Sequence, residues 1–328
     1  MARPAWLRDE DELPHSPGDA PLWCENYLSY LYAPDVGVGV WSHMCHRAGS
    51  PELWDEKFLV ALPGDRYLAA KAFSPGYADR GPRTSALWLS CQEPFARWTM
   101  RFTGAARLLD GAQLRSRPVA DGPHVPVELV LDVAAIGPAY DFGEEKLDQS
   151  WGTGHYEQPL RYRGRLRYGE ESLELDGTGL RDHSWGARDY TQIGSTAWIH
   201  GQFPESGRTF MAVGVTGQPP RGAFTYAVTG DRIAVRPATA AELPILHDRR
   251  GASEPYQLLL RGSDGTAATI DAEILGSLDM AFVGPTEIAL GTHGGPAVNH
   301  HYVISFTRFD WDGEVGYGVT DRTIERSH

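Results

Sequence analysis

The sequence predicts an all-β protein made of two tandem antiparallel β-barrels or sandwiches, with few short helices. Two observations carry this prediction. The 328 residues include 37 Gly and 23 Pro, and segments with the apolar spacing of a long helix are almost absent. Short runs of β-branched and aromatic residues, separated by turn residues, recur at roughly ten- to fifteen-residue spacing from Tyr27 onward. Because an eight-stranded barrel would take about half of the chain, we expect two consecutive units.

Individual strands are predicted from pairs of apolar runs that flank a turn. The runs pair as residues 58–62 with 67–73, 160–168 with 172–175, 256–261 with 266–274, and 302–309 with 315–319. The turns between them contain Gly64, Gly169, Gly265 and Gly313, and such turns suit the twist of adjacent antiparallel strands. Four hairpins are therefore expected.

The remaining segments suggest how the chain is divided. We expect an N-terminal extension over residues 1–22, a lipocalin-like first domain over 23–176 and a second over 177–328. A proline-rich loop is expected at residues 117–126 and an acidic loop at 137–154. A short helix is expected at 239–246, which contains two alanines and a glutamate.

The composition excludes several classes of function. The net charge of −13 argues against nucleic acid or an anionic membrane as a partner, because both require a basic surface. No apolar run reaches the roughly 18 residues of a membrane-spanning helix, so membrane insertion is not expected. The charged N-terminus does not resemble a signal peptide, and three cysteines do not suggest a disulfide framework. A cytoplasmic protein is expected, and a homodimer is left open.

The densest chemistry lies in residues 179–190. This run combines two arginines and two aspartates with a histidine, a serine, a tryptophan and a tyrosine. If it is extended, Arg181, His183 and Trp185 share one face of the strand. Asp182 and Ser184 then share the other. Such a mixture suits a partly buried polar network, in which charges must be paired to be tolerated.

Two interpretations of this run stay open. In the catalytic one, His183 has a tunable pKa and relays a proton, while burial keeps Asp182 protonated. In the structural one, Arg181, Arg188 and Asp189 join Asp182 in ion pairs that hold the two domains together. Equal numbers of arginine and aspartate are what a self-neutralising network needs.

Glu157 adds a second candidate carboxylate. Symmetric pairing about the turn at Gly169 makes Glu157 the cross-strand partner of Asp182, at a Cβ separation of about 5 Å. Two neighbouring carboxylates in a cavity would raise the pKa of one of them, which could then act as a general acid. The alternative is a buried salt bridge from Glu157 to Arg181 or Arg188.

Aromatic residues that alternate with polar ones mark candidate ligand-binding walls. Trp198 and His200 share one strand face together with Gln202, and Trp41 shares a face with His43. These faces are too polar for an ordinary core and too aromatic for a plain surface. Most other tryptophans are expected to belong to the core.

No metal or cofactor is expected from the motifs. Cys45 and its neighbouring histidines do not complete a zinc-binding pattern. His300 and His301 would point to opposite faces of a strand. The sequence also contains no Gly-x-Ser-x-Gly elbow, phosphate-binding glycine loop or dinucleotide-binding unit. A reaction that needs no cofactor fits what remains.

Four short segments carry a resemblance to a known superfamily. They are Glu25-Asn26-Tyr27, Gly154-His155-Tyr156-Glu157-Gln158, residues 177–189 and Gly316-Tyr317-Gly318-Val319. Over about residues 23–325 the chain resembles the carotenoid 1,2-hydratase-like, lipocalin-like proteins with two tandem β-barrels. It is more similar to their uncharacterised bacterial members, through the Arg-Asp-His-Ser-Trp-Gly run, than to genuine carotenoid hydratases.

The resemblance implies a hydrophobic small-molecule ligand. We expect a cofactor-independent hydratase, cyclase or isomerase that acts on a terpenoid, steroid or polyketide-derived substrate. Asp182 or Glu157, with His183, would protonate or orient this substrate. The residues expected to line its pocket are Tyr156, Trp185, Trp198, His200 and Trp41. A non-catalytic carrier or sensor of lipophilic molecules, and a pericyclase that only preorganises its substrate, are the alternatives.

Overall fold

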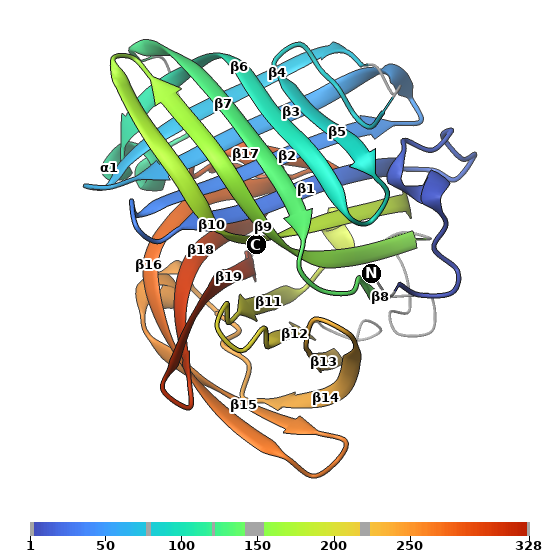
Figure 1. Cartoon of the computed structure of the whole chain (residues 1–328). Coiled ribbons are helices and arrows are strands. Elements are labelled where there is room, and N and C mark those ends of the chain that lie inside the picture. Colours follow the sequence, from blue (N-terminus) through green and yellow to red (C-terminus); the bar gives the residue numbers. More distant parts are fainter. Residues whose placement is uncertain (1–2, 77–79, 120–121, 142–153, 217–223, 327–328) are drawn as a thin grey trace. The chain divides into compact units, whose positions relative to one another are not determined.

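The computed structural model describes residues 3–76, 80–119, 122–141, 154–216 and 224–326 (Figure 1). The chain divides into two compact units. The first comprises residues 1–110 and 121–188, and the second comprises residues 111–120 and 189–328. Each unit has its own hydrophobic core, and each is described separately below.

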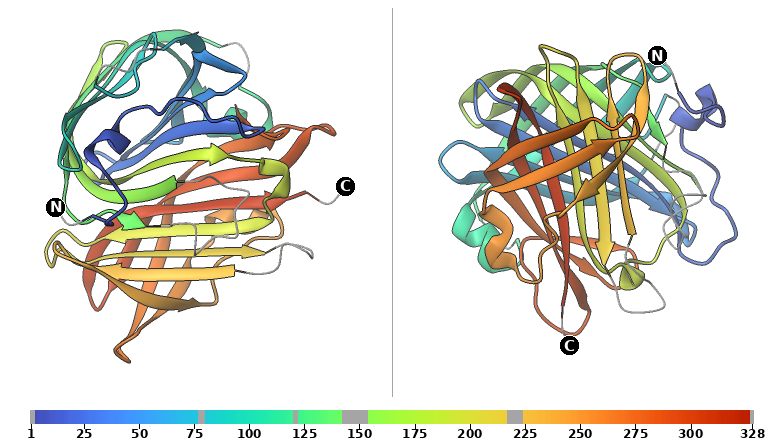
Figure 2. Two further views of the ribbon diagram at one scale, coloured as in Figure 1. Left: turned by 90° about the vertical axis from the view of Figure 1, so that its right-hand side faces the viewer. Right: turned by 90° about the horizontal axis from the view of Figure 1, so that it is seen from below.

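The first unit is an antiparallel barrel. It begins with a 3₁₀ helix, η1 (Asp9–Glu12). Its strands are β1 (Trp23–Ala33), β2 (Val38–Arg47), β3 (Ser50–Leu62), β4 (Arg66–Pro75), β5 (Leu87–Glu93), β6 (Arg97–Asp110), β7 (His124–Ala135), β8 (Tyr140–Asp141), β9 (Gly154–Tyr168) and β10 (Glu171–Ala187). The order β10-β1-β2-β3-β4-β6-β7-β9 closes on itself because β9 also pairs with β10 (Figure 2). Two further strands, β5 and β8, extend the sheet beside β6 and β9.

Alternating burial follows from this closure. Along β7, buried residues such as Leu129 and Leu131 alternate with more exposed ones, as expected for a strand with one face on the core. Side chains from all eight closing strands, among them Tyr27, Phe58 and Phe102, pack together inside the barrel. The interior is therefore filled with side chains, and it defines an inner and an outer side of the barrel wall.

Closure depends on glycines in β10, the strand that pairs with both β9 and β1. A Cβ added at Gly179 would lie 2.0 Å from the carbonyl oxygen of Tyr30 on β1. We therefore expect Gly179→Ala to destabilise the protein by about 1–3 kcal/mol, because β10 must move away from β1. Urea unfolding measures this change, with Gly49→Ala as the control, since nothing lies within 4 Å of a Cβ at Gly49. Equal midpoints for the two variants would contradict the expectation.

The second unit is a second antiparallel barrel. Its helices are α1 (Gly111–Ser116) and the 3₁₀ helices η2 (Tyr190–Gln192) and η3 (Arg249–Ser253). Its strands are β11 (Ser195–Gln202), β12 (Thr209–Thr216), β13 (Phe224–Gly230), β14 (Val235–Ala241), β15 (Tyr256–Gly262), β16 (Ala267–Val283), β17 (Glu287–Leu290), β18 (Val298–Trp311) and β19 (Glu314–Glu325). The order β15-β14-β13-β12-β11-β19-β18-β16 closes through the pairing of β15 with β16.

The predicted all-β fold with two tandem barrels is confirmed. All four predicted hairpins are present, as β3–β4, β9–β10, β15–β16 and β18–β19. The predicted boundary between residues 176 and 177 lies inside β10, whose whole length belongs to the first barrel, and the chain divides after Arg188.

The helix expected at 239–246 is wrong. Residues up to Ala241 belong to β14, which pairs with β13 and β15. Glu242 then has a positive φ of 54°, which a helix cannot accommodate. Backbone pairing on both sides of β14 outweighs the helix propensity of the alanines. The loop predicted at 117–126 extends too far, because β7 already begins at His124. The loop predicted at 137–154 contains the short β8, and its residues 142–153 lie outside the described part.

Among the described residues, no helix is long and apolar enough to cross a membrane.

Candidate functional site

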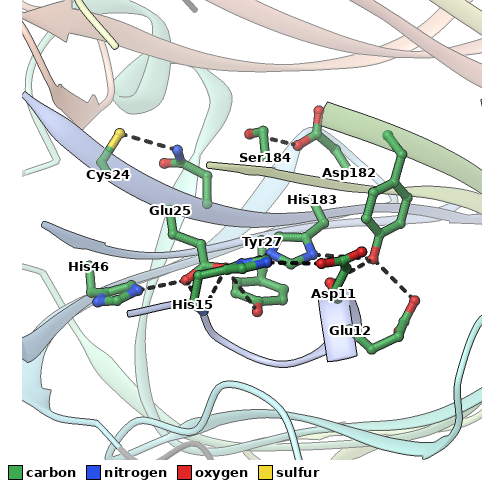
Figure 3. Close-up of polar contacts among 12 residues, drawn as sticks. Asp11, Glu12, His15, Cys24, Glu25, Tyr27, His46, Asp182, His183 and Ser184 are labelled. Carbon is green, nitrogen blue, oxygen red and sulfur yellow. Dashed lines mark hydrogen bonds and ion pairs between the residues drawn. The ribbon is translucent and has the colours of Figure 1, made fainter. Parts of the chain in front are cut away.

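Strands β9, β10 and β1 send alternate side chains to opposite sides of the first barrel's wall. His183 and Tyr27 are directly opposed across β10 and β1, and Tyr27 belongs to the interior core, so His183 points inward. Asp182 and Ser184 point outward. Figure 3 shows this separation, with Asp182 and Ser184 on one side of the strands and His183 on the other. The predicted alternation of the polar run is confirmed.

The inner side holds a buried carboxylate surrounded by imidazoles (Figure 3). Oε1 of Glu25 lies 2.6 Å from Nδ1 of His15 and 2.8 Å from Nε2 of His183. Oε2 of Glu25 lies 2.7 Å from Nε2 of His46 and accepts the backbone N–H of His15 at 2.9 Å. The Glu25 side chain is fully buried. Burial alone would raise the pKa of Glu25, but the three imidazoles hold it well below its usual range.

A second set of contacts continues from His183. Nδ1 of His183 lies 3.2 Å from the hydroxyl of Tyr156, and that hydroxyl donates to Oε1 of Glu12 at 3.1 Å. Glu12 forms a buried ion pair with Arg181 and accepts the indole N–H of Trp98 at 2.6 Å. The Arg181 guanidinium stacks over the Trp98 ring, 3.9 Å from its centroid. We call Glu12, His15, Glu25, His46, Tyr156, Arg181 and His183 together the inner cluster.

The two imidazoles on Oε1 of Glu25 differ in their preference for a proton. Burial lowers the pKa of His183, and Glu25 opposes this only in part. Burial also acts to lower the pKa of His15, but hydrogen bonds and charges from Glu25 and Asp11 leave that pKa raised. Burial places the pKa of Tyr156 well above its usual value. His15 is therefore the more readily protonated histidine of this pair.

The N-terminal extension supplies residues that sequence reasoning missed. Glu12 is the last residue of η1, and His15 follows it. Both belong to the inner cluster, although more than 140 residues of sequence separate them from Tyr156. Leu7 packs with Tyr156 in a small hydrophobic group of its own. Glu25, His46 and these two residues form no motif with regular spacing, so the only sequence signal was the early Glu25-Asn26-Tyr27 segment.

The outer side carries a second polar group. Nε2 of His155 lies 2.6 Å from Oδ2 of Asp182 and 4.0 Å from Oε1 of Glu157. Glu157 and Asp182 are directly opposed across β9 and β10, so the predicted cross-strand pair is confirmed. Ser184 donates to Oδ1 of Asp182 at 3.3 Å, and Arg188 donates to the Ser184 hydroxyl at 2.7 Å. We call His155, Glu157 and Asp182 the outer centre.

The expected protonated state of Asp182 is wrong. Burial favours the neutral carboxyl group, but the charge and hydrogen bond of His155 outweigh it, and Arg188 acts in the same direction. The pKa of Asp182 is therefore lowered, and this side chain is an anion that orients His155. Both side chains keep some access to solvent, with exposed fractions of 11% for His155 and 12% for Asp182.

An apolar row lies beside the outer centre on the same face. Leu180 lies two residues before Asp182 on β10. It is aligned with Tyr30 on β1, and Tyr30 is aligned with Trp41 on β2. The Trp41 ring stacks parallel to His43, with centroids 5.8 Å apart. The predicted common face of Trp41 and His43 is confirmed, and Tyr30 of this row is on β1, the strand that pairs with β10 beside Asp182.

The other predicted residues lie elsewhere. Trp198 and His200 share one face of β11 in the second unit. The core residues of that strand, Ala197 and Ile199, are on the other face. Burial lowers the pKa of His200 to about 3. Trp185 and Tyr156 are on the inner side of the first barrel, where the Trp185 ring stacks on His15 at 4.1 Å. Neither lies beside Asp182 on the outer face.

The predicted ion-pair network takes a different form. Arg181 pairs with Glu12 inside the barrel instead of with an aspartate of its own run, because strand alternation separates Arg181 from Asp182. The same separation places Arg181 on the opposite side of the wall from Glu157. Asp189 caps η2 by accepting the backbone N–H of Thr191 at 2.9 Å.

Two groups within the described residues have ligand atoms close enough to hold a metal ion. They are His15, Glu25 and His183 on the inner side, and the outer centre itself. Separate from both, a groove of about 720 Å³ in the first unit is lined by Arg97, Asp132, Arg161, Arg163 and neighbours on β5, β6, β7 and β9. The predicted catalytic residues do not line this groove.

Two closed antiparallel barrels in one chain define a tandem lipocalin-like fold, as the sequence predicts. The chain belongs to the family described as a domain of unknown function, DUF7064, whose sequence model matches residues 8–325. No curated protein matches the sequence.

Solved structures with the same fold include kievitone hydratase and CghA. Kievitone hydratase from Nectria haematococca superposes with a TM-score of 0.56 at 10% identity, over 97% of this chain and 93% of the hydratase. CghA superposes with a TM-score of 0.55 at 10% identity, over 94% of this chain and 90% of CghA. CghA with Sch210972 gives the same TM-score at 11% identity. These likenesses show the fold, and the membership in the carotenoid 1,2-hydratase-like superfamily stays a prediction.

Proposed function

We propose that the protein is a hydratase, cyclase or isomerase of a hydrophobic small molecule and that its reaction takes place at the outer centre. One observation carries the proposal. The His155 ring is held 2.6 Å from Asp182 and lies next to a second buried carboxylate, Glu157, with the apolar row on the same face. The first three groups move protons, and the row suits an apolar substrate body.

The pair of His155 and Asp182, called the dyad below, and Glu157 suggest a role for each side chain. Asp182 lies 2.6 Å from Nε2 of His155 and orients its ring, and His155 acts as the proton donor. In a hydration, His155 gives its proton to one alkene carbon, and water forms a C–O bond at the other. The water's second proton passes to Glu157, from which it returns to His155 over a present separation of 4.0 Å. The indole of Trp41 would stabilise positive charge that develops on the substrate.

The proposal differs from the sequence expectation in its proton donor. His155 replaces Asp182 and His183 in that role, because Asp182 is ionised and His183 lies on the other side of the wall. In a cyclisation, the same protonation would be followed by attack of an internal nucleophile of the substrate. No step needs a cofactor. A non-catalytic carrier of lipophilic molecules would use the aromatic row without the dyad.

The first experiment identifies the ligand. Protein purified from its own host would be examined by native mass spectrometry and then extracted with organic solvent. We expect a co-purified apolar molecule. Incubation of that molecule with fresh protein in deuterated water should then incorporate deuterium at carbon, because the proton donated by His155 exchanges with solvent. A bound molecule that stays chemically unchanged over many equivalents of protein would identify a carrier and overturn the enzymatic proposal.

A further inference from the structure

We propose that the inner cluster is a binding site for a divalent transition-metal ion, Zn²⁺ foremost, with His15, Glu25 and His183 as its ligands. Nδ1 of His15, a carboxylate oxygen of Glu25 and a ring nitrogen of His183 all lie within 4.8 Å of one another. Two imidazoles and one carboxylate are a ligand set that zinc sites use, with a fourth position left for water or another ligand.

The distances require only small side-chain movements. Zn–N and Zn–O bonds of about 2.0–2.1 Å place tetrahedral ligand atoms about 3.3–3.4 Å apart. Oε1 of Glu25 now lies 2.6 Å from Nδ1 of His15 and 2.8 Å from Nε2 of His183. Rotations that separate these atoms by several tenths of an ångström would admit the ion. The ion would also replace the two protons that otherwise have to converge on a single carboxylate oxygen.

Each proposed ligand is oriented from behind by another side chain. Asp11 lies 3.2 Å from the second ring nitrogen of His15. The Tyr156 hydroxyl lies 3.2 Å from Nδ1 of His183. Nε2 of His46 bonds the second oxygen of Glu25 at 2.7 Å. Metal-binding histidines and carboxylates regularly have such partners, which select the ring tautomer and hold the ligand atom in place.

The charges also balance for a divalent cation. Glu12 is neutralised by Arg181, with which it forms a buried ion pair. Two carboxylates, Glu25 and Asp11, remain around the ligand atoms, and their combined charge matches that of the ion. The outer centre has a similar ligand set but lies near the positive charge of Arg188, which opposes a cation. The inner cluster is therefore the favoured one of the two groups.

The ligands come from distant parts of the chain. His15 belongs to the segment after η1, Glu25 to β1 and His183 to β10, so a bound ion would tie the N-terminal extension to the barrel. This separation explains why no spacing pattern predicts the site, and the sequence expectation was that no metal is bound. The inference does not depend on the proposed function, since the inner cluster and the outer centre are on opposite sides of the wall.

The test uses Co²⁺ as a spectroscopic probe and then Zn²⁺. Full-length protein would be freed of metal with a chelator and titrated with Co²⁺. We expect one equivalent to produce the visible absorption of a four-coordinate Co²⁺ ion, and Zn²⁺ to displace it. Asp11→Asn should weaken Co²⁺ binding about 10–100-fold. His15→Asn should weaken it further, and it leaves the barrel strands unchanged. His155→Asn, which removes a ligand atom from the outer centre, is the matched control and should bind as the wild type does.

Protection of the N-terminal extension is a second readout. Zn²⁺ should slow proteolytic cleavage before β1 in the wild type and have no such effect in His15→Asn. The proposal is overturned if the folded wild type binds no Co²⁺ at one equivalent. It is also overturned if His155→Asn abolishes the absorption while His15→Asn retains it.

Discussion

Replacement of His155 by Asn is expected to lower kcat by about 10²–10⁴-fold, the usual contribution of a general acid. The reason is that His155 is the only imidazole within hydrogen-bonding distance of Asp182 among the described residues. Asp182→Asn is expected to lower kcat by a similar factor, because an amide in place of the carboxylate favours the wrong ring tautomer of His155. The measurement is kcat and KM for the compound obtained by extraction, in deuterated and ordinary water.

The control for this prediction is His124→Asn, because His124 is an exposed histidine of β7 away from the outer centre. It should turn over substrate at the wild-type rate. Trp41→Leu should mainly raise KM, since the aromatic row contacts the substrate body in the proposed reaction. Undiminished turnover in both His155→Asn and Asp182→Asn would remove the acid-base mechanism and favour a pericyclase that only holds its substrate in a reactive shape.

Arg181→Met is expected to destabilise the protein by about 3–5 kcal/mol, because it leaves the carboxylate of Glu12 buried without its counter-charge. The Arg181 side chain is 4% exposed and that of Glu12 is 1% exposed, so water cannot replace the lost partner. The Met side chain retains much of the apolar contact with Trp98. Urea unfolding, followed by tryptophan fluorescence and by circular dichroism, measures the change.

An exposed ion pair of the same barrel provides the comparison. Arg163 lies 2.9 Å from Asp176, with 65% of its side chain exposed, and Arg163→Met should cost less than about 1 kcal/mol. The double variant Glu12→Gln/Arg181→Met should recover part of the stability lost in Arg181→Met, since no buried charge is then left alone. Similar losses of stability in Arg163→Met and Arg181→Met would show that burial does not determine how much the Glu12–Arg181 ion pair contributes to stability.

Features that depend on neighbouring residues followed directly from the amino-acid order. The turn at Gly169 sets the register of β9 and β10, and this register makes Glu157 and Asp182 direct partners. The two-residue period of a strand puts Asp182 and His183 on opposite faces. These properties are local, because turn geometry and side-chain alternation involve only residues close in sequence. The all-β class was accessible for the same reason.

Which side of the barrel wall a side chain faces, and which partner each charged group has, could be learned only from the folded structure. Nothing in the spacing of residues indicates which face of β10 is inward, since that depends on how eight strands close around one core. Glu12 reaches Arg181, and Glu25 reaches His183, because closure brings β1 beside β10 and the N-terminal extension against the barrel. The pKa of Asp182 likewise depends on His155, a residue of another strand. Local order thus specified strands, turns and alternation, whereas long-range packing specified which polar groups meet and which of them carry charge.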